Sequence, residues 1–434
     1  MTRRRSPAVS VKHGTAEKYS ALRRLAKFLI ATVAVVAVSG GSVAAIAAWE
    51  ITAGVKGTHL VHLNSETGVS TLPDVSAISG GVNLLLAGTD TRTGQGGAYG
   101  TKAELAGSSG AGNNDVTMLL HIAENHQSMS VISFPRDMLV TVPSCPHDGG
   151  GASPAARRVM LNTTLSRGGL PCVVLTIEKL TGLHIPFAAE ISFDGVIAMS
   201  NAVGGVTVCL ATPVNDLYTT PPLHLAAGEQ SLVGEQALSF VRSRHGVGDG
   251  SDLGRISNQQ VFMSALARKV QSANVLSNPF LLYPLARAAV SNMVLSDTLT
   301  DPKTLVEIAL ALKDTGLANM VFLQYPTMAD TVDANRVVPL PSAATAVNAA
   351  LVADQPIRLS GLPGRAAGLA PGAASPGPAP TSDAASGPSS SAVKPGPATS
   401  GAPIVAGSAN VILPSTVTGQ TAAEQTCTRG FTGK

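Results

Sequence analysis

Short apolar runs and helical patterns alternate along the middle of the chain. Three runs of strand length, at 82–86, 116–123 and 129–134, are almost continuously apolar, which is typical of strands buried on both faces. Further along, apolar residues recur every three or four positions, and this period predicts helices. The predicted helices cover 173–180, 194–202, 235–241, 259–270 and 301–312. This alternation predicts a single α/β domain, layered α-β-α, with a central mixed sheet.

The N-terminal part predicts a membrane anchor. Residues 28–49 carry no charge, and a helix of these 22 residues would be about 33 Å long, enough to cross a bilayer core. Residues 1–27 hold eight Lys or Arg and one acid, so the positive-inside rule places them in the cytoplasm and the rest outside. A cleaved signal peptide is the alternative, since Ala45–Ala47 fits a small-x-small site. The length of the apolar run favours an uncleaved, single-pass signal-anchor.

Composition divides the remainder of the 434 residues. From 361 to 400, 32 of 40 residues are Ala, Gly, Pro or Ser, and such a segment cannot bury enough apolar surface to offset its ordering entropy. We therefore expect a cytoplasmic basic segment at 1–27, a transmembrane anchor at 28–49 and an extracellular stalk at 50–80. The folded domain is expected at 81–358 and a disordered tail at 359–434.

The charge balance argues against a nucleic-acid partner. The net charge is +3, but the first 27 residues contribute +7, so the remainder is at −4. The basic pI is therefore a property of one end of the chain, and the predicted external domain is net negative.

The four cysteines, Cys145, Cys172, Cys209 and Cys427, permit disulfides outside the membrane. Four cysteines allow three pairings, and the sequence does not select one. Cys145 and Cys172 bracket an insertion rich in Gly and Pro, so a disulfide between them is the first expectation. Their spacing does not suggest a zinc site.

Charged side chains lie where the predicted strands begin and end. Asp90 and Arg92 follow the first strand, Asp115 precedes the second, and Arg136 and Asp137 follow the third. Ligands of α/β sheets bind outside the carboxyl ends of the strands, so these side chains occupy the expected place for chemistry. The alternative is that they are solvated loop charges. Only 13% of the chain is charged, which makes this grouping unusual.

Later in the chain, a group of four polar residues suggests an anion-binding site. Arg242 and Arg244 are two apart in a segment predicted to be extended, so they point the same way. Arg255 and Gln259 are four apart on one face of the predicted helix. The planar fork of arginine suits phosphate, and Mg²⁺ commonly joins carboxylates to substrate phosphates. The residues predict a pyrophosphate site with Mg²⁺; a salt-bridged Arg/Asp cluster is the competing interpretation.

At this point the chain resembles the LytR-CpsA-Psr family over roughly residues 81–275. The resemblance rests on a set of motifs in a fixed order: Asn83–Arg92, Asn114–Leu119, Ile132–Asp137, Gly204–Val206, Leu232–Arg244, and Asp252–Arg255 with Gln259–Gln260. It implies a membrane-anchored phosphotransferase that moves a glycopolymer from a polyprenyl-pyrophosphate carrier to a peptidoglycan hydroxyl. The carrier would leave as a polyprenyl phosphate, and its apolar chain would lie in a groove between sheet and helices.

The resemblance also implies roles for single residues. Asp90 and Asp115 would hold Mg²⁺, and Asp137 would orient Arg136 or assist the acceptor. The residues around the pyrophosphate would be Arg92, Arg136, Arg242, Arg244, Arg255 and Gln259, with Arg136, Arg242 and Arg244 taking part in catalysis together with Asp137. A non-enzymatic membrane regulator or polymer-binding module with the same fold is the alternative.

Overall fold

The computed structural model describes the folded part of the chain after the predicted anchor. It describes residues 57–58, 60, 81–92, 95, 99, 101, 112–147, 149–272, 285, 288–300, 302–370 and 410–433. The predicted basic segment and the membrane anchor at 28–49 lie outside these residues. Within the described part, no helix combines the length and the apolarity that crossing a membrane requires.

A mixed sheet of eight strands forms the centre of the domain. Its order is β1-β14-β9-β2-β3-β4-β15-β21. The strands are β1 (Gly57–Thr58), β2 (Val82–Thr89), β3 (Asn114–Ile122), β4 (Met129–Phe134), β9 (Phe187–Ile191), β14 (Met293–Ser296), β15 (Met320–Gln324) and β21 (Gly419–Thr421). Strand β3 is antiparallel to β2 and β4, while β9 runs parallel to β2 and β15 parallel to β4. The end of β2, the start of β3 and the end of β4 therefore lie side by side at the same end of these central strands.

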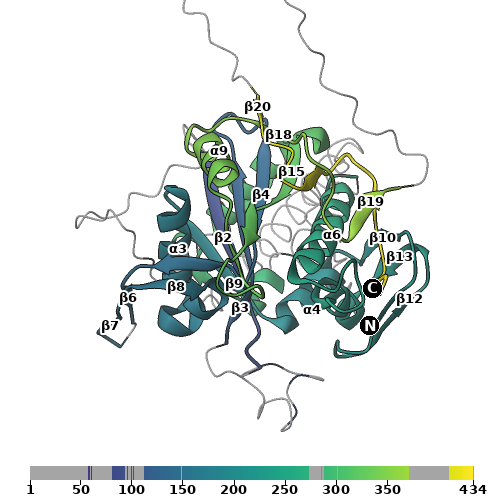
Figure 1. Ribbon diagram of the computed structural model, residues 1–434, viewed down its shortest axis with the longest axis horizontal. Helices are drawn as coiled ribbons and strands as arrows, with labels where there is room; N and C mark the ends of the chain where they lie inside the picture. Colours follow the sequence, from purple (N-terminus) through teal and green to yellow (C-terminus); the bar gives the residue numbers. More distant parts are fainter. Residues whose placement is uncertain are drawn as a thin grey trace, which may run out of the picture. The chain divides into compact units, whose positions relative to one another are not determined.

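Helices cover both faces of this sheet, as the sequence predicts. On one face α3 (Thr164–Thr181) and α9 (Pro341–Val352) pack over Leu85 and Leu119. On the other face α6 (Asp252–Ser272) and α8 (Pro302–Asp314) pack over Met118 and Phe322. Figure 1 shows α3 and α6 on opposite sides of strands β2, β4 and β15. The α-β-α layering and the mixed sheet are confirmed.

A second sheet of four strands lies against the outer side of α6. Its order is β13-β10-β22-β19, with bounds Gly228–Leu232, Val206–Leu210, Thr426–Thr428 and Ala367–Leu369. Helices α4 (Phe193–Ala202) and α5 (Gly234–Arg242) complete this side. The other pairs are β5 (Leu139–Val142) with β8 (Ala156–Met160), β6 (Cys145–Pro146) with β7 (Ala152–Ser153), β11 (Val214–Asp216) with β12 (Leu223–Leu225), β16 (Thr327–Ala329) with β17 (Val337–Pro339), and β18 (Ile357–Arg358) with β20 (Val411–Ile412). Short 3₁₀ helices are η3 (Leu161–Thr163), η5 (Asp297–Leu299) and η6 (Leu317–Asn319).

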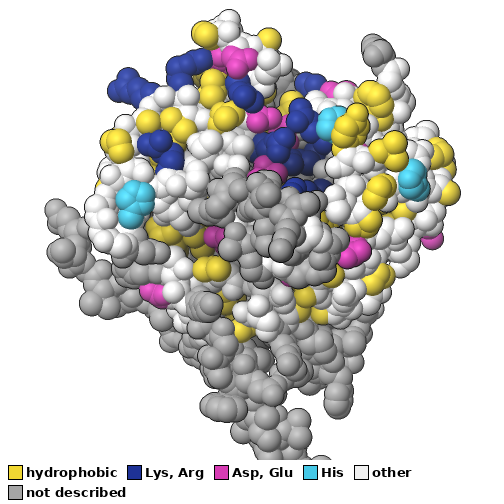
Figure 2. Space-filling view, turned by 90° about the horizontal axis from the view of Figure 1, so that it is seen from below, with side chains coloured by type: hydrophobic (Ala, Val, Ile, Leu, Met, Phe, Trp, Pro, Cys, Tyr) yellow, Lys and Arg dark blue, Asp and Glu magenta, His cyan; other side chains and the backbone are white. Residues whose placement is uncertain are grey.

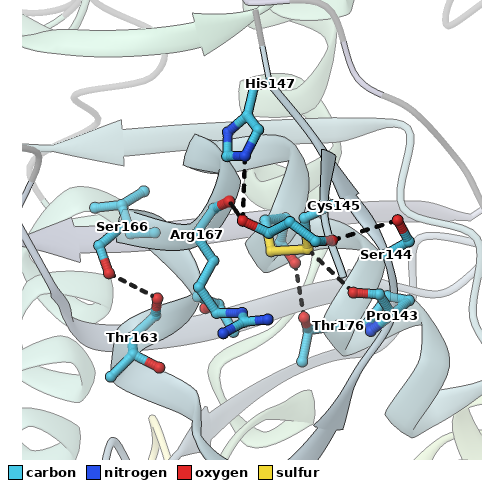
Figure 3. Close-up of a disulfide and its surroundings, with 12 residues drawn as sticks. Pro143, Ser144, Cys145, His147, Thr163, Ser166, Arg167 and Thr176 are labelled. Atoms are coloured by element: carbon cyan, nitrogen blue, oxygen red, sulfur yellow. Dashed lines mark hydrogen bonds between the residues drawn. A yellow bond between two sulfur atoms is a disulfide. The ribbon is translucent and has the colours of Figure 1, made fainter. Parts of the chain in front are cut away.

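The expected disulfide between Cys145 and Cys172 is present. It joins Cys145 of β6 to the middle of α3, and Figure 3 shows Cys145 with the neighbouring Pro143, Ser144 and His147. Helix α3 is kinked here, because Gly168 and Gly169 leave helical geometry and Gly169 has a φ of 66°. That left-handed conformation favours glycine. Both cysteines are fully buried, so the bond fastens an insertion to the core of the domain.

The prediction that 359–434 forms one disordered tail is wrong at both ends of this range. Strand β19 follows residue 359, and β20, β21 and β22 lie between 410 and 433. Strand β21 pairs with β15, and β22 pairs with β10, where a disulfide joins Cys209 to Cys427. These strands of two or three residues carry no periodic signal. Strands β19, β21 and β22 are stable because they extend sheets built by distant residues, and β20 pairs with β18. The part of the tail at 371–409 lies outside the described residues.

The predicted stalk at 50–80 also needs correction. Strand β1 pairs in parallel with β14 at the edge of the central sheet. Leu60 is buried in the cluster of apolar side chains that α3 and α9 cover. The domain therefore begins before residue 81, with a two-residue strand too short for its sequence to indicate.

Candidate active site

A cavity of about 450 Å³ lies between the central sheet and helices α4, α5 and α6. Most of its lining is apolar, with Leu86 and Met118 from the sheet and Phe193, Phe262 and Leu266 from the helices. The polar residues of the lining include Asp115, Arg136, Arg242, Arg244, Arg255 and Gln259. Six of the nine residues singled out from the sequence thus line one cavity. Figure 2 shows a hollow in one face of the molecule where Lys and Arg side chains gather with acidic ones among them.

The first part of the site is an ion pair where β3 begins and β4 ends. Asp115 begins β3 and Arg136 follows β4, so the antiparallel pairing of these strands brings them together. Arg136 Nη1 donates to Asp115 Oδ1 at 2.9 Å, and Arg136 Nε lies 3.5 Å from Asp252 Oδ1. Burial acts to lower the pKa of Arg136, but the carboxylates of Asp115, Asp252 and Asp137 offset it, and the net pKa lies above the ordinary value. This guanidinium is a fixed positive charge.

Asp137 points away from the cavity lining, toward a second arginine. Its Oδ1 lies 3.3 Å from Arg336 Nη1, and its Oδ2 lies 3.9 Å from Arg136 Nε. Arg336 comes from the segment before β17, about two hundred residues along the chain. Of the two roles that the resemblance implies for Asp137, this geometry favours orienting Arg136.

Asp90 and Arg92 follow β2 and are not among the cavity-lining residues. Asp90 Oδ1 accepts a hydrogen bond from the Asn113 backbone N–H at 2.6 Å, which joins the residue after β2 to the residue before β3. The charge of Arg92 is close enough to lower the pKa of Arg242, although burial is the largest cause of that lowering. Arg92 is therefore near the cluster, while Asp90 has a structural role in the loop beside it.

Arg242 is the most unusual cation of the site. Its guanidinium carbon lies 4.1 Å from the ring centroid of Phe193 and 5.7 Å from that of Tyr99. Its Nη1 is buried and has no hydrogen-bond partner among the described residues. A buried donor without a partner is costly, so the structure holds a guanidinium that is ready for an anion. The sequence places Arg242 in an extended segment; it is instead the last residue of α5.

Asp216 holds the loop that follows α5. It is 2% exposed, and its Oδ2 accepts hydrogen bonds from Ser243 Oγ at 2.8 Å, Arg244 N at 3.1 Å and Gly246 N at 3.0 Å. Burial raises the pKa of Asp216, but the hydrogen bonds from these donors together lower it by more. The net pKa of Asp216 therefore lies below its usual range. This carboxylate positions Arg244, whose Nε donates to the Gly250 carbonyl at 3.3 Å.

Helix α6 contributes a second ion pair and a glutamine to the site. Arg255 and Asp252 are each only 6% exposed, and their Nη2 and Oδ1 atoms lie 2.6 Å apart. Arg255 Nη2 also donates to the Asp115 carbonyl at 2.8 Å. Gln259 Nε2 donates to the Val241 carbonyl at 3.0 Å, which joins α6 to the end of α5. The expectation that Arg255 and Gln259 share one helical face is confirmed, because both line the cavity.

The residues fit a magnesium ion in part. Mg²⁺ prefers oxygen ligands and needs only one or two protein carboxylates when phosphates and waters complete its shell. Asp115 lines the cavity, and its Oδ2 is not engaged in the ion pair with Arg136. Both carboxylate oxygens of Asp90 face Asn113. The described residues contain no group of three or more His, Cys, Asp or Glu side chains that could hold a metal by themselves.

Sequence reasoning missed four contributors to this site. Asp252 was inside a recognised motif, yet only its neighbour Arg255 was singled out. Asp216, Tyr99 and Phe193 lie in segments without a motif, and their importance comes from contacts across the fold. A buried acid beside buried arginines can be identified only once the pairing of distant segments is known.

Comparison with known proteins identifies the same region. The model of the LytR_cpsA_psr family matches residues 54–350. The chain is 31% identical over 251 residues to the cell wall biosynthesis protein LcpA of Corynebacterium glutamicum, which covers 52% of this chain and 47% of that protein. It is 32% identical over 168 residues to the polyisoprenyl-teichoic acid–peptidoglycan teichoic acid transferase TagU of Bacillus mycoides, covering 38% of this chain and 50% of that one. The chain thus spans about half the length of these curated relatives.

A solved structure supports the fold. The crystal structure of protein gbs0355 from Streptococcus agalactiae superimposes with a TM-score of 0.50 at 23% identity, over 63% of this chain and 88% of that one. At this identity the likeness concerns the arrangement of strands and helices.

Proposed function

The chain belongs to the LytR-CpsA-Psr family, and on that premise we propose that it transfers a glycopolymer from a polyprenyl-pyrophosphate carrier to a hydroxyl group of peptidoglycan. The single observation that carries this proposal is the cavity itself. Its lining combines four arginines, Arg136, Arg242, Arg244 and Arg255, with a majority of apolar side chains. A ligand with an anionic pyrophosphate joined to a long hydrocarbon chain matches both kinds of side chain.

The proposed reaction is a phosphoryl transfer. The acceptor oxygen forms a bond to the phosphorus that carries the sugar, the hydroxyl proton is released, and the bond from that phosphorus to the bridging oxygen breaks. The polyprenyl phosphate leaves with the electron pair of that bond. Negative charge moves toward the leaving phosphate, so fixed positive charges beside it stabilise the transition state more than the bound substrate.

The arginines of this chain supply those charges. Arg242 lines the cavity, and its Nη1 has no hydrogen-bond partner among the described residues. Its guanidinium packs against the rings of Phe193 and Tyr99. Arg244 is positioned through its backbone by Asp216, while Arg136 and Arg255 are held by Asp115 and Asp252. These groups are oriented before substrate arrives, so little reorganisation is needed during the reaction.

We propose Mg²⁺ as the cofactor, with Asp115 of the cavity lining and Asp90 of the adjoining loop as the carboxylates that would hold it. When bound, the ion would neutralise charge on the pyrophosphate oxygens. If Asp90 takes part, Asp90→Ala makes the rate nearly independent of added Mg²⁺, whereas Asp90→Asn, which keeps an oxygen acceptor for Asn113, preserves the loop. Equal Mg²⁺ dependence in the parent and Asp90→Ala would remove Asp90 from the proposed site.

We also propose that residues 28–49 anchor the enzyme in the cell membrane with the folded part outside. The support is the uncharged run and the basic segment before it. A polyprenyl carrier stays in the bilayer, so an anchored enzyme is close to its substrate. A reporter fused after residue 434 should be active only outside the cell, and the mature protein should begin near Met1. An N-terminus near Ala48 would instead show cleavage.

Release of polyprenyl phosphate tests the proposed activity. We expect the purified protein with Mg²⁺ to release it from a short-chain, sugar-bearing donor, and to attach the sugar phosphate to peptidoglycan fragments. Arg242→Ala and Arg244→Ala should each lower the rate about 10²–10³-fold, since each removes a preorganised donor to the moving charge. Lysine at either position should restore only part of the rate, because it lacks the fork of arginine.

The matched control is Arg157→Ala. Arg157 is exposed on β8, which packs on the other side of the sheet, so this variant should keep the parent rate. If the Arg242 and Arg244 variants fold normally and also keep the parent rate, the enzyme assignment fails, and a polymer-binding module with this fold takes its place.

A further inference from the structure

An aromatic side chain stands in solvent at the polar part of the cavity. Among the tyrosines that the structure describes, Tyr99 and Tyr325 are 1% exposed, while Tyr218 is 80% exposed. Its neighbour Leu217 is 71% exposed. Large apolar side chains that remain exposed beside a cavity commonly mark a binding surface.

The backbone under this tyrosine is held firmly. The Tyr218 N–H donates to Asp216 Oδ1 at 3.0 Å, while the other oxygen of the same carboxylate holds Arg244 and Gly246. One buried acid therefore sets the position of Tyr218 relative to the arginine that follows α5. A movement of one segment would break the hydrogen bonds of the other.

Three further hydrogen bonds fasten the rest of this loop. Ser239 Oγ of α5 and Thr219 Oγ1 both donate to the Pro221 carbonyl, at 2.8 Å and 2.9 Å. The Tyr99 hydroxyl donates to the Thr220 carbonyl, and the Tyr99 ring is one of the two that lie beside the Arg242 guanidinium. The loop is thus attached to α5 and to the tyrosine that lies beside Arg242, while the Tyr218 side chain is 80% exposed.

Tyr218 is paired with a second ring. The centroids of Tyr218 and His245 are 4.5 Å apart, with the planes tilted by 45°. Both residues and Thr219 line the same cavity as Arg242 and Arg244. The two rings and the Thr219 hydroxyl form a surface, here called the Tyr218 platform, that adjoins the proposed pyrophosphate site.

We propose that the Tyr218 platform binds a pyranose ring. The C–H face of a sugar ring is apolar and packs on an aromatic face, while its hydroxyl groups bind the exposed His245 imidazole. A sugar hydroxyl can also donate to the Thr219 oxygen, whose own proton goes to the Pro221 carbonyl. The inference rests on the proposed function: the sugar is either the first residue of the donor glycan, joined to the pyrophosphate, or the acceptor sugar of peptidoglycan. The prenyl chain matches the apolar lining of the cavity, away from the arginines.

Binding measurements test the platform without requiring turnover. Two soluble ligands are compared by calorimetry: farnesyl pyrophosphate, and the same compound carrying one N-acetylhexosamine on its terminal phosphate. We expect the parent to prefer the sugar-bearing ligand, and Tyr218→Ala to lower this preference about tenfold. Tyr218→Phe keeps the ring and should keep the preference. Leu217→Ala is the matched control, because Leu217 is as exposed as its neighbour but does not line the cavity.

A soluble peptidoglycan disaccharide forms the second arm of the experiment. If Tyr218→Ala leaves the donor preference intact but weakens binding of the disaccharide about tenfold, the platform holds the acceptor sugar. If Tyr218→Ala weakens both prenyl ligands by the same factor and leaves the disaccharide unaffected, the inference is wrong, and Tyr218 contacts the prenyl pyrophosphate or only supports the loop. Failure of the proposed function looks different: the parent turns over neither donor, while the binding preference and its dependence on Tyr218 remain measurable.

Discussion

Removing the disulfide between Cys209 and Cys427 should destabilise the domain more than removing the one between Cys145 and Cys172. The sequence separations are 218 and 27 residues. In the chain-entropy model, closing loops of these lengths restricts the unfolded chain by about 5.4 and about 3.6 kcal/mol. The difference of about 2 kcal/mol is the meaningful quantity, because each double variant removes two sulfur atoms; Cys145, Cys172 and Cys427 are fully buried and Cys209 is half-buried.

The same perturbation should also loosen the site. The segment after Cys427 is hydrogen-bonded to the loop that follows α5 and carries Arg244. The Phe431 N–H donates to the Gly246 carbonyl at 2.8 Å, and the Gly248 N–H donates to the Arg429 carbonyl at 2.9 Å. Without the disulfide, this segment is attached by the three-residue strand β22 and by hydrogen bonds, with no covalent link to β10. We therefore expect Cys209→Ala with Cys427→Ala to lower the transfer rate as well as the free energy of unfolding.

Urea unfolding and amide exchange measure the two effects. Free energies of unfolding of the two double variants are compared with the parent, and hydrogen exchange reports on the Gly248 amide. The Cys145→Ala, Cys172→Ala variant serves as the control and should retain protection at Gly248. The reasoning is refuted if the Cys209/Cys427 variant is no less stable than this control, or if the Gly248 amide stays equally protected in both.

Three further predictions concern buried polar groups. Asn258→Ala should lower the free energy of unfolding by about 1–3 kcal/mol in urea titration. Asn258 Oδ1 accepts from the buried Thr428 Oγ1, which would lose its acceptor, and Asn258 Nδ2 donates to the Phe240 carbonyl, which would keep only the Ser243 N–H. Asp252→Asn should cost about 3 kcal/mol by the same measurement, since it leaves the buried Arg255 without its carboxylate; an undiminished stability would show that Arg255 is solvated. Burial raises the pKa of Glu190 to about 7, so its folded form favours the proton, and stability should fall as pH rises from about 4.5 to 7. Glu190→Gln should remove that part of the pH dependence, while Glu235→Gln, at an exposed position, should leave it unchanged.

Local pattern was sufficient for the elements that carry the chemistry. Strand β4 has the predicted bounds, and β2 and β3 differ from the expectation by a few residues at their ends. The helix expected at 259–270 forms most of α6. These elements are long enough for their periodicity to be read, and they bury apolar faces on one sheet. The edge where Asp115 and Arg136 meet then follows from strand order, because polar residues at the ends of neighbouring strands are brought together.

The sequence by itself therefore determined the α-β-α layering, the family and six residues of one cavity. Only the tertiary structure decided which acid holds which arginine, that Asp90 faces Asn113, and that Arg242 ends a helix over Phe193. It also decided that the chain after residue 410 completes two sheets. The physical reason is the sequence separation between the residues that are in contact. Periodicity reports which face of an element is buried, whereas Asp216 with Arg244, or Cys209 with Cys427, are contacts between distant segments that form only when the whole core has packed.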